Sequence, residues 1–262
     1  MSNLIQWPAA KYWTKCWNPI VGCVECSPAC ANCYAREMLK NRFGQPFKPH
    51  PSKSQRPPLS GVVFCGNMTD LFGDWVEEPQ RFIKQTAKLY RAPGTPYLYL
   101  TKRVMSMLRA LFDGAMPGST GAKVHDLRKC GCGFGSHWFG FTAEDQERYD
   151  DRCGDWRFGA PIWARGWLSA EPLLGPIDLG LRYIAPEDRP FEWVVVGCES
   201  GPNRRPCDIR WVEWIVQECL SAGVLVFVKQ LDIGGRCVTD INQFPAHLRI
   251  RQVPWAVVED ER

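Results

Sequence analysis

The sequence of 262 residues lacks the features that mark secreted, membrane-spanning and intrinsically disordered proteins. It contains no run of about 18 apolar residues that would cross a bilayer. The opening MSNLIQWPAAKYW has neither the basic start nor the apolar run of a signal peptide. Hydrophobic residues make up 45% of the chain and charged residues 23%, which is ordinary for a folded protein. We therefore expect a globular protein of the cytoplasm with no membrane partner.

A strong imbalance of charge is also missing. The formal net charge is +4 and the pI is about 8.4, whereas a domain built for DNA usually has a pI above ~9. We find no internal sequence repeat, and no acidic tail longer than the final EDER. The overall charge therefore permits contact with nucleic acid or phosphate but does not by itself indicate it.

Cysteine, in contrast, is abundant, with thirteen residues. In a reducing compartment, clustered cysteines are more often metal ligands or catalytic groups than disulfides, and an odd number cannot be fully paired. Four of them lie within eleven positions near the start of the chain. These are Cys23, Cys26, Cys30 and Cys33.

Six apolar runs of strand length recur along the chain, ending near residues 67, 103, 144, 172, 200 and 230. The ends are 28 to 41 residues apart, and a parallel strand with its return helix needs about 30. The runs are apolar throughout, as in parallel strands covered on both faces. With a strand or turn before Cys23, they predict one α/β domain over residues 1–262: a partial (β/α)6–7 barrel of the TIM type, with the cysteine loop after its first strand. An open doubly wound sheet is the alternative.

The gaps between the runs contain helical patterns and two insertions. We predict helices over 77–91 and 208–223, the second opening on an Asp cap and closing on Gly. The second helix is predicted to present Trp211, Trp214, Ile215 and Cys219 on one face. Inserted loops are expected at about 44–61, which is rich in proline and basic residues, and at 117–137, which is rich in glycine.

Polar residues follow each of the six strand runs. In a barrel of parallel strands the active site lies at the carboxyl ends of the strands, so six polar ends in succession predict one convergent site. The mixture of carboxylates and amines suits a zwitterionic ligand, such as an amino acid joined to a nucleoside. The residues are Asn67, Asp70, Thr101, Lys102, Arg103, Thr142, Glu144, Ser169, Glu171, Glu199, Ser200, Lys229 and Gln230.

The clustered cysteines can be grouped as Cys26-x3-Cys30-x2-Cys33 or as Cys23-x6-Cys30-x2-Cys33. A [4Fe–4S] cluster is normally held by four thiolates, and three leave one iron open. Radical S-adenosylmethionine (SAM) enzymes use such an iron to bind SAM. Structural zinc on all four thiols is the alternative, although its two cysteine pairs are usually separated by a dozen or more residues. Unliganded thiols are a third interpretation.

Blocks of sequence in a fixed order carry a resemblance to a known family. They read WNPIVGC, SPACANCYA, FCGNMTDLF, LTKR, GFTAEDQERYDDR, LSAEPLLGPID, VVVGCESGPNRRPCDIRW and VFVKQ. Together, from about Trp17 to Gln230, they resemble a phage-associated family of unknown function within the radical SAM superfamily. The resemblance implies a partial barrel that carries one [4Fe–4S] cluster and SAM, and an external electron donor. It also implies the cytoplasm of the host cell if the protein is phage-encoded.

The resemblance also implies roles for particular residues. The cluster ligands fall on Cys23, Cys30 and Cys33, with Cys26 as the alternative first ligand because it gives the commonest superfamily spacing. Asn32 stands where the superfamily usually has an aromatic residue. By analogy with the strand ends of the superfamily, the candidate SAM-binding residues are Gly66, Asn67, Asp70, Lys102, Thr142, Glu144, Ser169 and Glu171. The candidate catalytic residues are Lys102, Glu199 and Lys229; for Lys102, a structural salt bridge in the barrel is the alternative.

Apart from Cys16, the remaining cysteines divide into two groups. Cys130, Cys132 and Cys153, with His125 or His137, are candidates for zinc or a second cluster, but we favour an inserted loop without metal. The second group is expected to act as small buried hydrophobic side chains. Its members are Cys65, Cys198, Cys207, Cys219 and Cys237.

The sequence indicates the substrate more weakly than it indicates the cluster and SAM. Residues 44–61 are basic, and Arg204 and Arg205 follow a strand end, where a guanidinium suits phosphate. A solvated basic surface is the alternative for each. Because the resembled family is frequent in phages, which modify their DNA, we expect modification or rearrangement of a nucleic-acid base that is flipped out of the duplex. The alternatives are a radical SAM enzyme acting on a small molecule or peptide, and a zinc-bearing nucleic-acid-binding module without enzymatic activity.

Overall fold

The computed structural model describes residues 6–42, 44, 46–88, 94–114, 136–161 and 164–255. Its centre is an eight-stranded sheet whose spatial order follows the chain. In order, the strands are β1 (Lys15–Trp17), β4 (Val63–Cys65), β5 (Tyr97–Thr101), β6 (His137–Thr142), β7 (Arg165–Ala170), β8 (Trp193–Gly197), β9 (Leu225–Ile233) and β10 (Arg236–Val238). All neighbours from β1 to β9 are parallel, and β10 is antiparallel to β9. The α/β class, the parallel sheet and the six predicted strands are confirmed.

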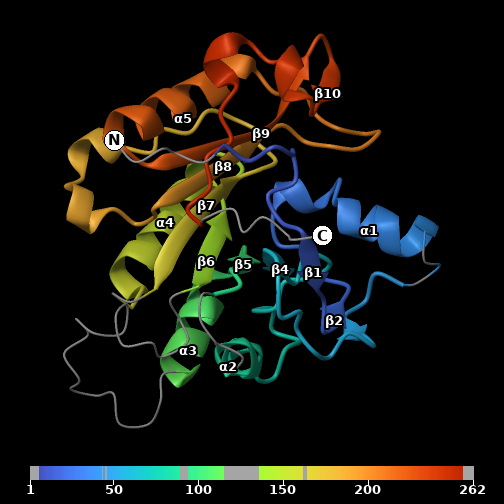
Figure 1. The fold of residues 1–262 in the computed structure, drawn as a ribbon. Helices are drawn as coiled ribbons and strands as arrows, with labels where there is room; N and C mark the ends of the chain where they lie inside the picture. Colours follow the sequence, from blue (N-terminus) through green and yellow to red (C-terminus); the bar gives the residue numbers. More distant parts are fainter. Residues whose placement is uncertain are drawn as a thin grey trace.

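Helices cover one side of the sheet. They are α2 (Gln80–Ala87), α3 (Val104–Gly114), α4 (Gln146–Gly159) and α5 (Ile209–Ala222), and Figure 1 shows them following the order of the strands. The short helix α1 (Tyr34–Glu37), continued by a π-helix over Met38–Arg42, lies on the other side. A doubly wound sheet reverses its strand order partway, and this sheet does not, so that alternative is wrong. None of the described helices is long and apolar enough to span a membrane.

The alternation of side chains along each strand gives the sheet two different faces. The face toward the helices is aliphatic and aromatic throughout. On the other face the beginnings of the strands are aromatic, with Trp138, Trp167, Trp193 and Phe227 all buried. Tyr12, from the N-terminal segment, fills the space above them, with its ring centroid 5.2 Å from that of Trp193. Because alternate residues share a face, the polar ends of these strands project above this aromatic layer.

Helix α5 begins and ends as predicted. The Asp208 carboxylate accepts a hydrogen bond from the Arg210 backbone N–H, and Gly223 ends the helix at φ +69°. The predicted buried face was partly wrong, because the buried stripe starts one residue later. It consists of Val212, Ile215, Val216 and Cys219, while Trp214 is 51% exposed.

Two predictions about the other cysteines and the second insertion need correction. Cys237 is only partly buried on β10, whereas the other four cysteines expected in the core are buried. His137 does not belong to the insertion but is the buried first residue of β6, and Cys153 is buried in α4. The candidate second metal group of Cys130, Cys132 and His125 lies outside the described residues.

Gly140 of β6 leaves room for the Trp167 indole in the aromatic layer. The Trp167 indole crosses from β7 over Gly140 of β6, which is its partner in register, and donates to the Tyr99 carbonyl of β5 at 3.1 Å. A Cβ at Gly140 would lie 2.4 Å from the indole ring atoms.

We therefore expect Gly140→Ala to lower the free energy of unfolding by about 3 kcal/mol, through steric overlap and loss of the indole hydrogen bond. Gly154→Ala is the matched control, because a Cβ there meets nothing within 4 Å. Gly154 lies inside α4, so this change should stabilise the protein by about 0.5 to 1 kcal/mol. Urea denaturation measures both, and equal effects would show that the indole does not depend on Gly140.

Candidate active site

A cavity of about 510 Å³ opens at the carboxyl ends of the parallel strands. Its volume is within the range of small-molecule and cofactor sites. One wall is the cysteine loop between β2 (Ile20–Val21) and α1, and the opposite wall is formed by the strand ends. Its floor is the upper side of the aromatic layer, where Tyr12, Trp13 and Phe64 line it. The cavity is therefore apolar at its base and polar around its sides.

All four clustered cysteines line this cavity. The backbone holds their loop in short turns: the Cys30 N–H donates to the Ser27 carbonyl at 2.9 Å, and the Cys33 N–H donates to the Cys30 carbonyl at 3.3 Å. Cys23 is tied to another part of the chain, through its N–H to the Phe47 carbonyl at 3.4 Å. The structure thus brings Cys23 and Cys26 to the same wall and leaves the choice of first ligand open.

The cysteines differ in how readily they lose a proton. A hydrogen bond from the Cys26 thiol lowers the pKa of Cys30 to about 4; burial opposes this change, and Lys102 and Ser27 add to it. Cys26 and Cys30 share one proton, so the pKa of Cys26 is raised, first by that hydrogen bond and then by burial. Burial, together with the nearby Asp70 carboxylate, raises the pKa of Cys23 to about 11. Since metals bind the thiolate, the Cys26–Cys30 pair can present a thiolate to a metal.

The polar residues at the strand ends pair with one another. Four carboxylates around the site each have a cationic partner, and the predicted mixture of charges is present. The pairs are Asp70 with Arg103, Glu144 with Lys102, Glu171 with Lys229, and Glu199 with Arg205. These contacts neutralise the wall internally, so a ligand would meet dipoles and paired charges rather than a free ion of either sign.

Glu144 is the most deeply buried of these carboxylates, with no exposed surface. Its Oε2 accepts from Arg152 Nη1 at 2.7 Å and from Lys102 Nζ at 3.3 Å. Burial raises its pKa, but Lys102 and Arg152 together lower it more, so the net pKa lies below its ordinary value. Oε1 is buried and has no hydrogen-bond partner among the described residues. The carboxylate therefore holds Lys102 at the cavity wall and keeps one acceptor unused.

Asp70 has a structural role as well as a place on the wall. Its carboxylate accepts from the Thr101 hydroxyl at 2.8 Å, from the Lys102 N–H at 3.2 Å and from Arg103 Nη1 at 3.2 Å. These bonds join the loop after β4 to the end of β5. Asp70, predicted to bind the cofactor, is thus seen to fix the turn that positions Lys102.

A clamp connects the cysteine loop to the loop after β8. Glu199 is 3% exposed and accepts from Asn32 Nδ2 at 3.0 Å, while its Oε2 accepts from Arg205 Nε at 3.0 Å. Arg205 also donates to the Pro28 carbonyl at 3.0 Å. Asn32 thus serves as a hydrogen-bonding link where the superfamily resemblance led us to expect an aromatic residue. Residues 167 positions apart are joined in this way.

Most of the predicted site residues meet at the cavity. Those that line it are Gly66, Asn67, Asp70, Lys102, Thr142, Ser169, Glu171, Glu199 and Lys229. Glu144 is not among the lining residues but contacts Lys102. The guanidinium groups of Arg204 and Arg205, predicted for phosphate, are committed to Asp232 and Glu199.

The sequence analysis missed the contribution of the N-terminal segment. Lys11, Tyr12 and Trp13 line the cavity, and so does Tyr34 of α1. The run KYWT directly before β1 contains two aromatic residues, and this was the one available signal. It has no helical or strand period, so it could not be assigned to an element or a face.

The chemistry of the cavity lining bears on whether it could hold an iron–sulfur cluster and SAM. The donor set fits, because four thiols on one short loop face one cavity, and Cys30 is disposed to ionise. Arg103 and Lys102 lie close enough to act electrostatically on Cys26, which suits a cluster with thiolate ligands. In the described part of the chain, no three His, Cys, Asp or Glu side chains are arranged to hold a metal ion, so ligation would require the thiols to turn toward one another.

We expect Arg205→Ala to loosen the cysteine loop, because it removes the donor to Pro28 and leaves Glu199 without its cation. The loss of hydrogen bonds to a charged group should increase the alkylation rate of the loop thiols about tenfold in metal-free protein. Peptide mapping after timed iodoacetamide labelling measures this rate. Arg204→Ala is the matched control, since Arg204 pairs with Asp232, away from the loop. Equal labelling rates in the two variants would contradict the clamp.

Because the clamp depends on the ionised Glu199 carboxylate, we expect the free energy of unfolding to depend on pH. Burial raises the pKa of Glu199, but the hydrogen bonds from Arg205 and Asn32 lower it more, so its net pKa lies below 4.5. Its ionised form therefore stabilises the fold above pH 4.5, and this contribution is lost as the pH falls through the lowered pKa. In urea titrations, the difference in unfolding free energy between wild type and Glu199→Gln should be constant near neutrality and shrink below pH 4.5. A difference that does not change with pH would contradict this role.

One of three comparisons with known proteins finds a match. A scan against protein families matches residues 9–244 to DUF5131, which is described as a protein of unknown function. A search of curated proteins finds no match, and a search of solved structures finds none either. The match covers most of the chain, including the cysteine loop, the strand ends and the clamp. The chain therefore belongs to the DUF5131 family.

Proposed function

We propose that this chain is a radical SAM enzyme built on a partial (β/α) barrel. The observation that carries this proposal is the placement of four thiols on one loop, all lining a cavity at the carboxyl ends of parallel strands. The sequential strand order and the helices on one side of the sheet support the barrel. A structural zinc site would have no need of a large cavity beside its ligands.

Cys30, Cys33 and Cys23, with Cys26 as the alternative to Cys23, are the residues proposed to hold a [4Fe–4S] cluster. The strand ends opposite them, including Asn67, would receive the polar groups of SAM. When bound, the cluster and SAM together would supply a 5′-deoxyadenosyl radical that abstracts a hydrogen atom from the substrate. The residues proposed to bind SAM lie at strand ends, whose positions are fixed by the sheet.

The residues of the chain itself would bind and orient the ligand and shield it from water. Lys102, paired with Glu144, and Lys229, paired with Glu171, present two fixed ion pairs to the ligand. Both lysines are candidate catalytic residues, together with Glu199. The aromatic floor of Tyr12 and Phe64 keeps water from the base of the cavity. Such positioning and shielding is the part that a protein plays in cofactor chemistry.

We propose a nucleic-acid base as the substrate, in a modification or rearrangement reaction. The cavity opens at one end of the barrel, so a base would have to leave its stack to enter. The basic residues of segment 44–61 support this choice, since Lys48, Lys53 and Arg56 are exposed. A small molecule or a peptide is the alternative substrate, and it predicts no salt-sensitive binding of nucleic acid.

Anaerobic purification with iron and zinc analysis tests the chemistry. We expect a brown wild-type protein with about four irons and an absorption near 400 nm. Cys30→Ala and Cys33→Ala should each lose the colour, and of Cys23→Ala and Cys26→Ala only one should do so, which identifies the first ligand. Cys219→Ala, a buried cysteine of α5, is the matched control and should keep its iron. A colourless protein with bound zinc would instead support the zinc-bearing module and refute the radical chemistry.

A further inference from the structure

Two segments of the chain carry positive charge without any acidic residue. Residues 44–61 and 80–88 contain six lysines and arginines and no acidic residue. Because the net charge of the whole chain is +4, the remainder of the chain sums to −2. The six cations are Lys48, Lys53, Arg56, Arg81, Lys84 and Lys88, all exposed, and we call them the basic track.

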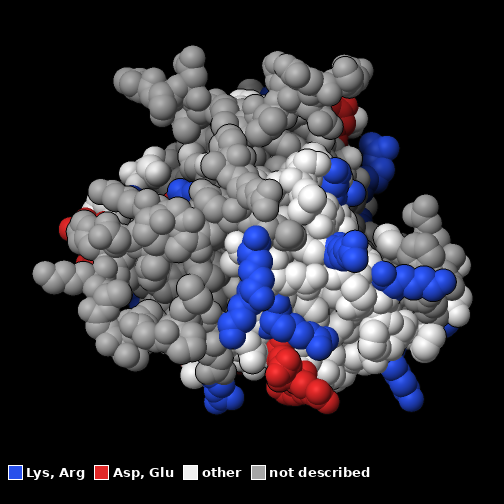
Figure 2. Space-filling view, turned by 60° about the horizontal axis from the view of Figure 1, so that its bottom comes forward, with Lys and Arg blue, Asp and Glu red and all other residues white. Residues whose placement is uncertain are grey.

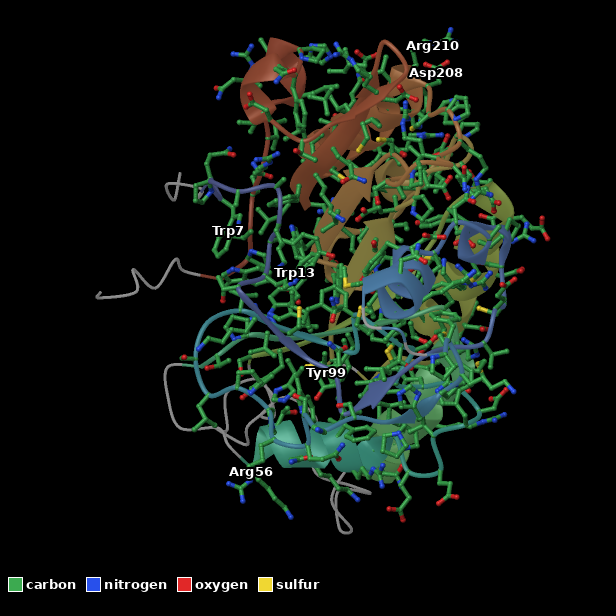
Figure 3. The ribbon with its side chains drawn as sticks, turned by 90° about the vertical axis from the view of Figure 1, so that its right-hand side faces the viewer. Trp7, Trp13, Arg56, Tyr99, Asp208 and Arg210 are labelled. Atoms are coloured by element: carbon green, nitrogen blue, oxygen red, sulfur yellow. The ribbon has the colours of Figure 1, made fainter. Side chains whose placement is uncertain are left out.

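The two segments lie beside each other on the surface. The Gln85 side chain of α2 donates to the Gln55 carbonyl at 2.9 Å, which joins the helix to the loop carrying Lys53 and Arg56. On α2, residues 81, 84 and 88 follow the spacing of one helical face. Figure 2 shows Lys and Arg side chains gathered on the side of the molecule where α2 lies, and in Figure 3 Arg56 projects outward beside this helix.

The basic track reaches the cysteine loop. The Lys48 carbonyl lies against Gly22, where a Cβ would approach it to 2.3 Å, and the neighbouring Phe47 carbonyl accepts from the Cys23 N–H. Farther along, the Trp17 indole donates to the Ser54 carbonyl at 3.1 Å. The cations therefore extend from the rim of the cavity, along the β1 edge of the sheet, to α2.

These cations have no ion-pair partner among the described residues, in contrast to the paired cations of the cavity wall. The nearest acidic residues along the chain are Asp74, Glu77 and Glu78, which precede α2 and favour the positive end of its dipole. Six exposed cations without partners on one track repel one another, and a bound polyanion would relieve this repulsion.

We propose that the basic track binds the phosphate backbone of a nucleic-acid strand and leads it to the cavity; this rests on the nucleic-acid substrate proposed above. Several exposed cations on adjoining segments suit a chain of phosphates, which carries one negative charge per nucleotide. A membrane surface fits less well, because Phe82 and Ile83 of α2 are buried in the core. Leu59 is the one large apolar side chain exposed among the described residues of these segments, too little to insert into a bilayer.

The test is fluorescence anisotropy of the full-length protein with a labelled single-stranded oligonucleotide of about 20 bases, over a range of salt concentrations. If six phosphates are contacted, log K should fall with log salt at a slope of roughly −4. The triple variant Arg81→Gln, Lys84→Gln and Lys88→Gln should reduce the slope to roughly −2 and weaken binding about a hundredfold near 0.1 M salt.

The control is Arg157→Gln, Arg210→Gln and Arg236→Gln, which removes the same charge from exposed sites on α4, α5 and β10. Arg210 and Arg56 lie at opposite ends of the molecule (Figure 3). The control should bind like wild type, and circular dichroism should show both variants folded. Equal weakening in both variants, or binding of wild type to phosphatidylserine vesicles but not to the oligonucleotide, would overturn the proposal. Because the assay needs no iron, its result is independent of whether the protein holds a cluster.

Discussion

The two-residue alternation of parallel strands is the constraint on which the rest of this structure depends. On the face away from the helices, β6, β7 and β8 carry Trp138, Trp167 and Trp193 near their starts, and alternate positions then lead to Glu144, Glu171 and Glu199. The same alternation thus places aromatic side chains at the beginnings of the strands and carboxylates at their carboxyl ends. Gly140 completes this layer, because its lack of a side chain lets the Trp167 indole cross β6 and reach β5.

The strands and the convergence of their polar ends could be predicted from the sequence because both follow from local patterns. Apolar runs at regular spacing indicate parallel strands, and residues directly after them must meet at one edge. The pairing of these residues could not be predicted in full. Arg205 binds Glu199 rather than a ligand, and Asn32 joins them from a loop far away in the sequence, which no local pattern records.

The N-terminal segment and the buried face of α5 show the same limit. Tyr12 and Trp13 become part of the cavity through contacts with several strands, although their own segment has no period. In α5 the cap and the terminal glycine are local signals and were correct, whereas the buried face depends on how the helix lies against β8 and β9. Helical spacing places Trp214 on one face with Ile215 and Cys219, yet its side chain is 51% exposed.

The cysteine loop is held from three directions: by Phe47 near the basic track, by its own turns, and by the clamp through Glu199. Radical SAM chemistry requires such a loop to support a cluster that responds to SAM. Electron paramagnetic resonance of the anaerobically reduced protein, recorded with and without SAM, tests this most directly. The account predicts the signal of a reduced [4Fe–4S] cluster that changes shape when SAM is added. A protein without this signal, or with one that SAM leaves unchanged, would contradict it.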